Sequence, residues 1–221
     1  MTDEMIHDIA HLGHVEILTP KPEESLRFFV DVMGMTQTAR EGDSVYLRGW
    51  DDYEHHSLQL TASAKPGLGH YALRAESPQA LQQRVGTIER SGLGKGWKEN
   101  NSGHGPAYCF YDPDGHSIEI YHETEWYQPS GETKPALKNQ ASRYSDRGVG
   151  LRRLDHIALF AADVRSNRQF MQDVLGARMT EQVIFDDGSE KAAWVTFTNK
   201  SYDVTFAEDL DSTLKCNFEG C

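Results

Sequence analysis

Two short segments of the chain alternate apolar and polar residues, and each begins at a histidine. They are HVEI, from His14 to Ile17, and HIAL, from His156 to Leu159. A period of two residues is typical of a strand with one buried face. Both histidines are therefore predicted to lie on strands.

The regions around the two histidines are related to each other. His14 and His156 lie 142 positions apart, and the same offset pairs four more residues without a gap. These pairs are Phe28 with Phe170, Asp31 with Asp173, Val32 with Val174 and Gly34 with Gly176. A fixed offset indicates that one structural module occurs twice.

An amphipathic helix follows the first predicted strand. Leu26, Phe29, Val30 and Met33 recur at helical spacing, and Gly34 is a typical helix terminator. Residues 44–50 and 56–62 then alternate as strands, and residues 194–199 and 202–208 take their places in the second copy. Each copy therefore opens as a βαββ unit.

The first copy continues, whereas the second has no such continuation in this sequence. Residues 69–75 form a predicted strand, residues 78–94 a predicted helix, and residues 107–123 a predicted hairpin turning at Asp-Pro-Asp-Gly. The sequence predicts an α+β fold of tandem paired βαβββ modules, with the second half of the C-terminal module missing. We expect an N-terminal domain at 1–126, a linker at 127–149 rich in Pro, Gly, Ser and charge, and a partial C-terminal domain at 150–221.

Composition limits the kinds of partner. The formal net charge is -12 and the pI is near 5.2, so we expect neither nucleic acid nor an anionic membrane surface as a partner, but a small molecule. The N-terminus lacks a signal-peptide pattern, and no run approaches the roughly 18 apolar residues of a membrane span, which predicts a cytoplasmic protein. Cys109, Cys216 and Cys221 have no C-x-x-C spacing, which argues against a disulfide framework or a thiolate zinc site.

Three residues of the first copy could hold a metal ion. His14, His70 and Glu119 fall on three separate predicted strands of a curved sheet. Such strands can direct two imidazoles and one carboxylate into a single concavity. This is the arrangement that holds Fe(II) and leaves one side of the metal open.

Several of these segments resemble one enzyme family. The openings LGHVEIL and LDHIALF, the helices LRFFVDVMGM and RQFMQDVLGA, the strand GHYALRA and the hairpin DPDGHSIEIY are similar to type I extradiol dioxygenases, the catechol 2,3-dioxygenase-like members of the vicinal oxygen chelate (glyoxalase/bleomycin resistance) superfamily. The resemblance runs from about residue 10 to about residue 214.

The resemblance implies a metal site in the C-terminal module. It implies Fe(II), with Mn(II) as an alternative, and assigns His156 as the first metal ligand. The other two ligands are expected beyond Lys215. Tyr202 occupies a pocket position where the family often has a histidine. The N-terminal module of the family usually binds no metal, so His14, His70 and Glu119 are expected to form an empty site.

The implied function is extradiol cleavage of catechol or a substituted catechol by O2 during aromatic compound degradation, in a homo-oligomer. We expect this chain alone to be inactive. Two alternatives stay open: a non-catalytic small-molecule binding protein of the same superfamily, or a metal-dependent isomerase or lyase that uses the first-module trio.

Further expectations concern side chains around these sites. Residues that would face the missing half-module are expected to leave an apolar patch and to cause self-association: Leu159, Phe170, Val174, Val195 and Phe197. His104 is predicted to lie in a surface loop, and His55 and His56 in a turn and at a strand start. Asp51, Asp52 and Glu54 are predicted to form a solvated charge cluster.

Overall fold

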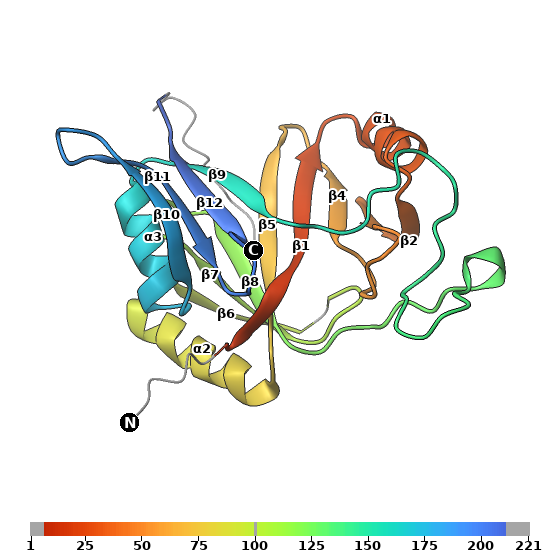
Figure 1. Ribbon diagram of the computed structural model, residues 1–221, viewed down its shortest axis with the longest axis horizontal. Coiled ribbons are helices and arrows are strands. Elements are labelled where there is room, and N and C mark those ends of the chain that lie inside the picture. The colour runs from red at the N-terminus through yellow and green to blue at the C-terminus, as the bar shows by residue number, and fades with distance from the viewer. Residues whose placement is uncertain (1–6, 100, 211–221) are drawn as a thin grey trace.

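The computed structural model describes residues 7–99 and 101–210, which form two sheets with helices packed against them (Figure 1). Cys216, Cys221 and the segment after Lys215 lie outside the described residues. No helix among the described residues is long and apolar enough to cross a membrane.

The larger sheet has eight strands in the order β2-β3-β4-β1-β5-β8-β7-β6. Its strands are β1 (Ile9–Thr19), β2 (Thr36–Glu41), β3 (Ser44–Arg48), β4 (Leu58–Ala62), β5 (Gly67–Ala75), β6 (Gly94–Lys98), β7 (Ala107–Tyr111) and β8 (Ser117–Tyr121). Each half of this sheet contributes one βαβββ unit, because a helix follows the first strand of each half. The predicted α+β architecture of paired units is confirmed.

The helices of this first module begin and end where the sequence indicates. The first predicted helix is split into α1 (Pro22–Arg27) and a π-helical turn (Phe28–Val32). Helix α2 (Pro78–Ser91) begins at Ser77, whose side chain accepts a hydrogen bond from the Ala80 N–H. It ends at Gly92, which adopts the left-handed conformation with φ 78°.

The smaller sheet has the order β10-β11-β12-β9 and carries one helix. Its elements are β9 (Ile157–Ala161), α3 (Val164–Asp173), β10 (Arg178–Ile184), β11 (Glu190–Thr196) and β12 (Val204–Glu208). The connector between the two sheets contains one short 3-10 helix, Gly131–Thr133, and otherwise lacks regular structure.

The pairing of the strands supports the predicted repeat. In the first module the Val15 N–H donates to the Ser57 carbonyl, and in the second the Ile157 N–H donates to the Asp203 carbonyl, both at 3.1 Å. Val15 and Ile157 are related by the 142-residue offset, so Ser57 and Asp203 occupy equivalent positions.

One detail of the repeat differs from the prediction. His14 lies within β1, where it pairs with Ala72 of β5, whereas β9 begins one residue after His156. The physical reason is that β9 pairs only with β12 in the part of the chain that the structure describes, so no second neighbour extends its start.

The predicted apolar patch on the second module does not form. Leu159, Phe170, Val195 and Phe197 are buried, and Val174 is partly buried against the same core. This cluster is continuous with residues of α2, β5, β7 and β8, and α2 contacts the C-terminal end of α3, where the Arg84 guanidinium donates to the Val174 carbonyl at 3.1 Å. The expectation was wrong because the first module, rather than a further strand set, covers these side chains.

Candidate functional site

Three neighbouring strands of the larger sheet bring the predicted trio together. His14 of β1 is in register with Ala72 of β5, which is in register with Glu119 of β8. His70 enters from β5 two residues earlier. The three side chains are 1%, 5% and 1% exposed, and their ligand atoms lie within 4.8 Å of one another. Of the described residues, only these three form a group able to hold a metal ion.

A second carboxylate orients His70. The His70 Nδ1 lies 2.9 Å from Glu16 Oε2, while the His70 Nε2 lies 3.0 Å from the His14 Nε2. Glu16 is itself held by hydrogen bonds from Gln59 and Thr61. Burial lowers the pKa of His70, but the hydrogen bond and charge of Glu16 together with the charge of Glu119 outweigh it, so the pKa is raised.

One oxygen of the Glu119 carboxylate accepts a hydrogen bond, and the other has none from the described residues. The Lys98 ammonium donates to Glu119 Oε1 at 2.8 Å. Glu119 Oε2 is buried, has no hydrogen-bond partner and lies 3.7 Å from the His70 Nε2. Burial raises the pKa of Glu119, but the charges of His70 and Lys98 lower it further than burial raises it, so the carboxylate stays ionised at neutral pH.

Two histidines that we did not assign to a site, His56 at a predicted strand start and His104 in a predicted surface loop, belong to this one. His56 is buried with its ring centroid 4.5 Å from that of His14, and His104 lies 5.2 Å from His14 and stacks on Tyr121 at 4.4 Å. The prediction of a surface loop for His104 was therefore wrong. Burial, with the nearby histidines, lowers the pKa of His14 and His56 well below the usual value, which leaves both imidazoles neutral.

The histidines line a cavity of about 370 Å³. Its walls also carry several polar side chains from β3, β4, β6 and the loop before β7. The lining residues are His14, Glu41, Tyr46, His56, Gln59, His70, Lys98, Glu99, Asn101, Ser102, His104 and Glu119. The trio thus lies at the wall of a polar cavity rather than in closed core.

Glu54 does not belong to a solvated charge cluster. It is buried, accepts a hydrogen bond from the Tyr121 hydroxyl at 2.7 Å, and pairs with His11 at 3.1 Å and Arg74 at 3.4 Å. Because Tyr121 packs on both His14 and His104, Glu54 fixes one wall of the histidine cluster. The cluster prediction failed for Glu54, while Asp51 does pair with Arg152 and Arg153 near the surface.

The second-module residues His156 and Tyr202 also lie together. Their ring centroids are 4.7 Å apart in an edge-to-face arrangement. The His156 Nδ1 is 2.8 Å from Asp155 Oδ2, and the imidazole side chain is 39% exposed. A carboxylate on Nδ1 leaves Nε2 available to a metal ion, so the donor chemistry of His156 fits the implied role.

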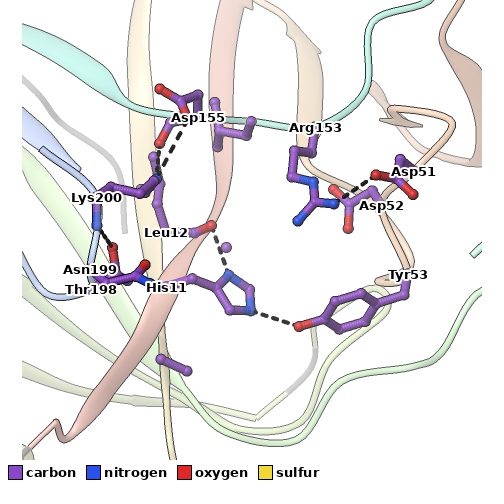
Figure 2. Close-up of a pocket in the computed structure, with 13 residues that line it drawn as sticks. His11, Leu12, Asp51, Asp52, Tyr53, Arg153, Asp155, Thr198, Asn199 and Lys200 are labelled. Atoms are coloured by element: carbon purple, nitrogen blue, oxygen red, sulfur yellow. Dashed lines mark hydrogen bonds and ion pairs between the residues drawn. The ribbon is translucent and has the colours of Figure 1, made fainter. Parts of the chain in front are cut away.

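A second cavity, of about 400 Å³, lies between the two modules (Figure 2). His11 and Tyr53 line one side, where the Tyr53 hydroxyl lies 3.3 Å from the His11 Nε2, and Lys200 and Asp155 line the other. Four of its charged groups form two ion pairs, Lys200 with Asp155 and Arg153 with Asp51. The described residues that line this cavity include no group able to hold a metal ion.

One family model matches two separate segments, which together make up most of the chain. Residues 11–120 and 153–213 match the model described as the Glyoxalase/Bleomycin resistance protein/Dioxygenase superfamily. The two matched segments contain β1 to β8 and β9 to β12, respectively.

Several known proteins that are similar to the chain are named as metapyrocatechases or dioxygenases. The chain is 48% identical over 206 residues to a metapyrocatechase of Geobacillus stearothermophilus, covering 93% of this chain and 63% of that protein. It is 31% identical over 202 residues to a manganese-dependent 2,3-dihydroxybiphenyl 1,2-dioxygenase of Geobacillus genomosp. 3, covering 90% of this chain and 64% of that protein. The fold matches the 2,3-dioxygenase LapB from Pseudomonas sp. KL28 with a TM-score of 0.83 at 23% identity, over 92% of this chain and 72% of LapB.

Proposed function

Because the chain belongs to the Glyoxalase/Bleomycin resistance protein/Dioxygenase superfamily, we propose that the whole protein is a metal-dependent extradiol dioxygenase that cleaves a catechol-type ring next to its two hydroxyl groups. The observation that carries the proposal is the 48% identity to metapyrocatechase along 93% of the chain. The chain spans just under two thirds of the length of the curated relatives that it matches, so the activity is proposed for the whole protein.

We assign His156 as one ligand of the catalytic metal. Its Nδ1 is engaged by Asp155, which fixes the ring orientation and leaves Nε2 as the donor atom. Fe(II) is the proposed ion, with Mn(II) as the alternative, since one relative is manganese-dependent. When bound, the metal would bring the diol and O2 together and polarise both.

Tyr202 is proposed to line the same pocket. Its ring packs against the edge or face of the His156 imidazole, at the position that His56 takes beside His14. The contribution that its geometry supports is positioning, because the phenol ring restricts the rotation of the imidazole and keeps water from one side of it.

The remaining features of the proposal follow from the relatives and the composition. The substrate is catechol or a substituted catechol, with O2 as the second substrate. The protein is proposed to act in the cytoplasm as a homo-oligomer, and its domains are proposed to run over 1–126 and 150–221 with the linker at 127–149.

The test is ring cleavage by a chimera in which the C-terminal part of the G. stearothermophilus metapyrocatechase follows residue 210 of this chain. Catechol and O2 are supplied with Fe(II) or Mn(II), and the yellow ring-fission product is measured. We expect turnover, and we expect His156→Ala to lower it by about 100-fold or more because a direct ligand is lost. His122→Ala, which removes a histidine that bonds the Ala75 carbonyl outside both sites, is the matched control.

Two outcomes would contradict the proposal. A folded chimera that yields no product, beside active metapyrocatechase under the same conditions, would reject ring cleavage. Undiminished turnover by His156→Ala, with His122→Ala unchanged as well, would remove His156 from the metal site while leaving the reaction in place.

A further inference from the structure

We propose that His14, His70 and Glu119 bind a divalent first-row metal ion, at a site separate from that of His156. The resemblance to extradiol dioxygenases implied that this trio would be empty, and the geometry of the first module points the other way. The inference does not depend on the proposed ring cleavage.

The two imidazoles are arranged as neighbouring metal ligands. Their Nε2 atoms are 3.0 Å apart and both belong to the buried cluster. Two ligands about 2.1 Å from one ion and at right angles to each other would be separated by about 3 Å. Each imidazole therefore already lies at ligand spacing from the other, on strands that hold it in place.

His70 has the kind of partner that metal-ligating histidines usually have. The Glu16 carboxylate lies 2.9 Å from the His70 Nδ1, and the His70 Nε2 lies 3.0 Å from the His14 Nε2 and 3.7 Å from the Glu119 Oε2. A carboxylate on one ring nitrogen of a ligating histidine orients the ring, so that its other nitrogen points at the metal.

One oxygen of Glu119 is an independent sign that this position suits a cation. Among the described residues Oε2 has no hydrogen-bond partner, its side chain is 1% exposed, and its ion-pair contact is the His70 Nε2 at 3.7 Å. A buried carboxylate oxygen without a hydrogen bond is costly, and native proteins rarely leave one. Lys98 occupies Oε1, so a metal ion on Oε2 completes the carboxylate without displacing the lysine.

The cavity supplies the open side of such a site. It holds about 370 Å³ next to the trio, and the buried His56 Nε2, which has no hydrogen-bond partner, lies beside it. Two nitrogens and one carboxylate with open positions favour Fe(II), Mn(II) or Co(II), whereas Mg²⁺ prefers an all-oxygen site. The remaining positions would be filled by water or by a small oxygen-bearing ligand in the cavity.

The test is metal binding by the 221-residue chain itself. After removal of metal with a chelator, the chain is titrated with Mn²⁺ alone, and free Mn²⁺ is followed by electron paramagnetic resonance and heat by calorimetry. We expect one equivalent to bind. Glu119→Gln keeps the shape of the side chain and removes its charge, and we expect it to weaken Mn²⁺ binding by about 100-fold or more.

Matched variants separate this site from that of His156. His70→Ala should lose the bound equivalent, while His122→Ala and His156→Ala should each keep it. Circular dichroism of each variant checks the fold, and Glu119→Gln serves where His70→Ala fails to fold. Failure of the wild-type chain to bind Mn²⁺ at millimolar concentration, or equal affinity in Glu119→Gln, would overturn the inference. Ring cleavage by the chimera could still succeed in that case, because it depends on the second module.

Discussion

The imidazole of His156 meets the phenol ring of Tyr202 edge to face, with ring centroids 4.7 Å apart. The equivalent pair in the first module is His14 and His56, whose centroids are 4.5 Å apart. Equivalence follows from the backbone, because Asp203 and Ser57, each directly after the second ring, accept the same hydrogen bond from β9 and β1. The chain thus repeats a histidine with an adjoining ring, while the type of ring and the angle between the rings differ, at 46° in the first module and 82° in the second.

The first prediction concerns Tyr202 in the chimera. Since the observed contact is made by the ring, Tyr202→Phe should keep turnover within about threefold, while Tyr202→Ala should lower it by about 10-fold to 100-fold, as loss of a ligand-orienting group does. Steady-state kinetics with catechol would measure both. A loss in Tyr202→Phe as large as in Tyr202→Ala would show instead that the hydroxyl takes part in the chemistry.

The second prediction concerns Lys98. Its ammonium sits on Glu119 Oε1, so it repels a divalent ion on Oε2. Lys98→Gln keeps an N–H donor near that oxygen and removes the charge, and we expect Mn²⁺ to bind about 10-fold more tightly, the effect of a unit charge about 5 Å from a dication in a water-like dielectric. Calorimetry measures the affinity. Lys95→Gln, on the same strand but against the Tyr111 ring, is the control and should change little. Weaker binding in Lys98→Gln would mean that orienting Glu119 matters more than the repulsion.

The hydrophobic pattern of the sequence predicted the helices and strands that pack in the core, but it missed the strands at the edges of the two sheets. The constant offset of 142 residues aligned β1 with β9 and the first helix of each module, because the paired residues recur without a gap, although Phe28 is 49% exposed and its counterpart Phe170 is buried. The missed strands β2, β6 and β10 are all edge strands of their sheets. They are largely exposed and carry little apolar alternation, so periodicity has nothing to detect in them.

The sequence also predicted only some of the residues of the candidate site. His14, His70 and Glu119 could be found because alternation on strands fixes the face of each side chain. His56 and His104 lie outside the strands, so only tertiary packing brings them to His14. A signal for His56 did exist: the predicted strands 56–62 and 202–208 take equivalent places and begin at His56 and Tyr202, and Tyr202 was already expected to line a pocket.

The third prediction concerns Asp203, the buried acid at the start of β12. Burial raises the pKa of its carboxyl, but hydrogen bonds from Lys200, the Phe197 N–H and Thr196 outweigh this and lower the pKa. A lowered pKa contributes stability at pH values above the unfolded-state pKa of about 3.9, and this contribution is lost as the pH falls through the folded-state pKa. Asp203→Asn should therefore cost about 1.5–3 kcal/mol of unfolding free energy at pH 7, and the difference from wild type should shrink below about pH 4.

Urea unfolding from pH 7 down to pH 3 measures that difference. Asp187→Asn is the matched control, because Asp187 also accepts hydrogen bonds, from Ser189, but lies in an exposed hairpin. We expect it to have a much smaller effect. A difference for Asp203→Asn that stays constant down to pH 3 would indicate a packing effect rather than the loss of the charge.

The last prediction concerns the core that joins the two modules. Phe170 of α3 is 6% exposed and its ring lies 6.2 Å from that of Phe110 on β7, within a cluster that includes α2. Truncation of a buried phenylalanine costs about 3–5 kcal/mol, because transfer and cavity terms add. Since the cluster is continuous, both modules should unfold together, and Phe170→Ala should lower the midpoint of one shared thermal transition by about 10 °C.

Phe160→Ala is the control for this prediction, because Phe160 lies in β9 of the same module but is 71% exposed. It should change the free energy of unfolding by no more than about 0.5 kcal/mol. Calorimetry detects the transition, and near-ultraviolet circular dichroism reports the four tryptophans, of which Trp194 lies in the second module and Trp50, Trp97 and Trp126 in the first. Two separate transitions, with only the second-module signal shifted by Phe170→Ala, would show that the shared core does not couple the modules.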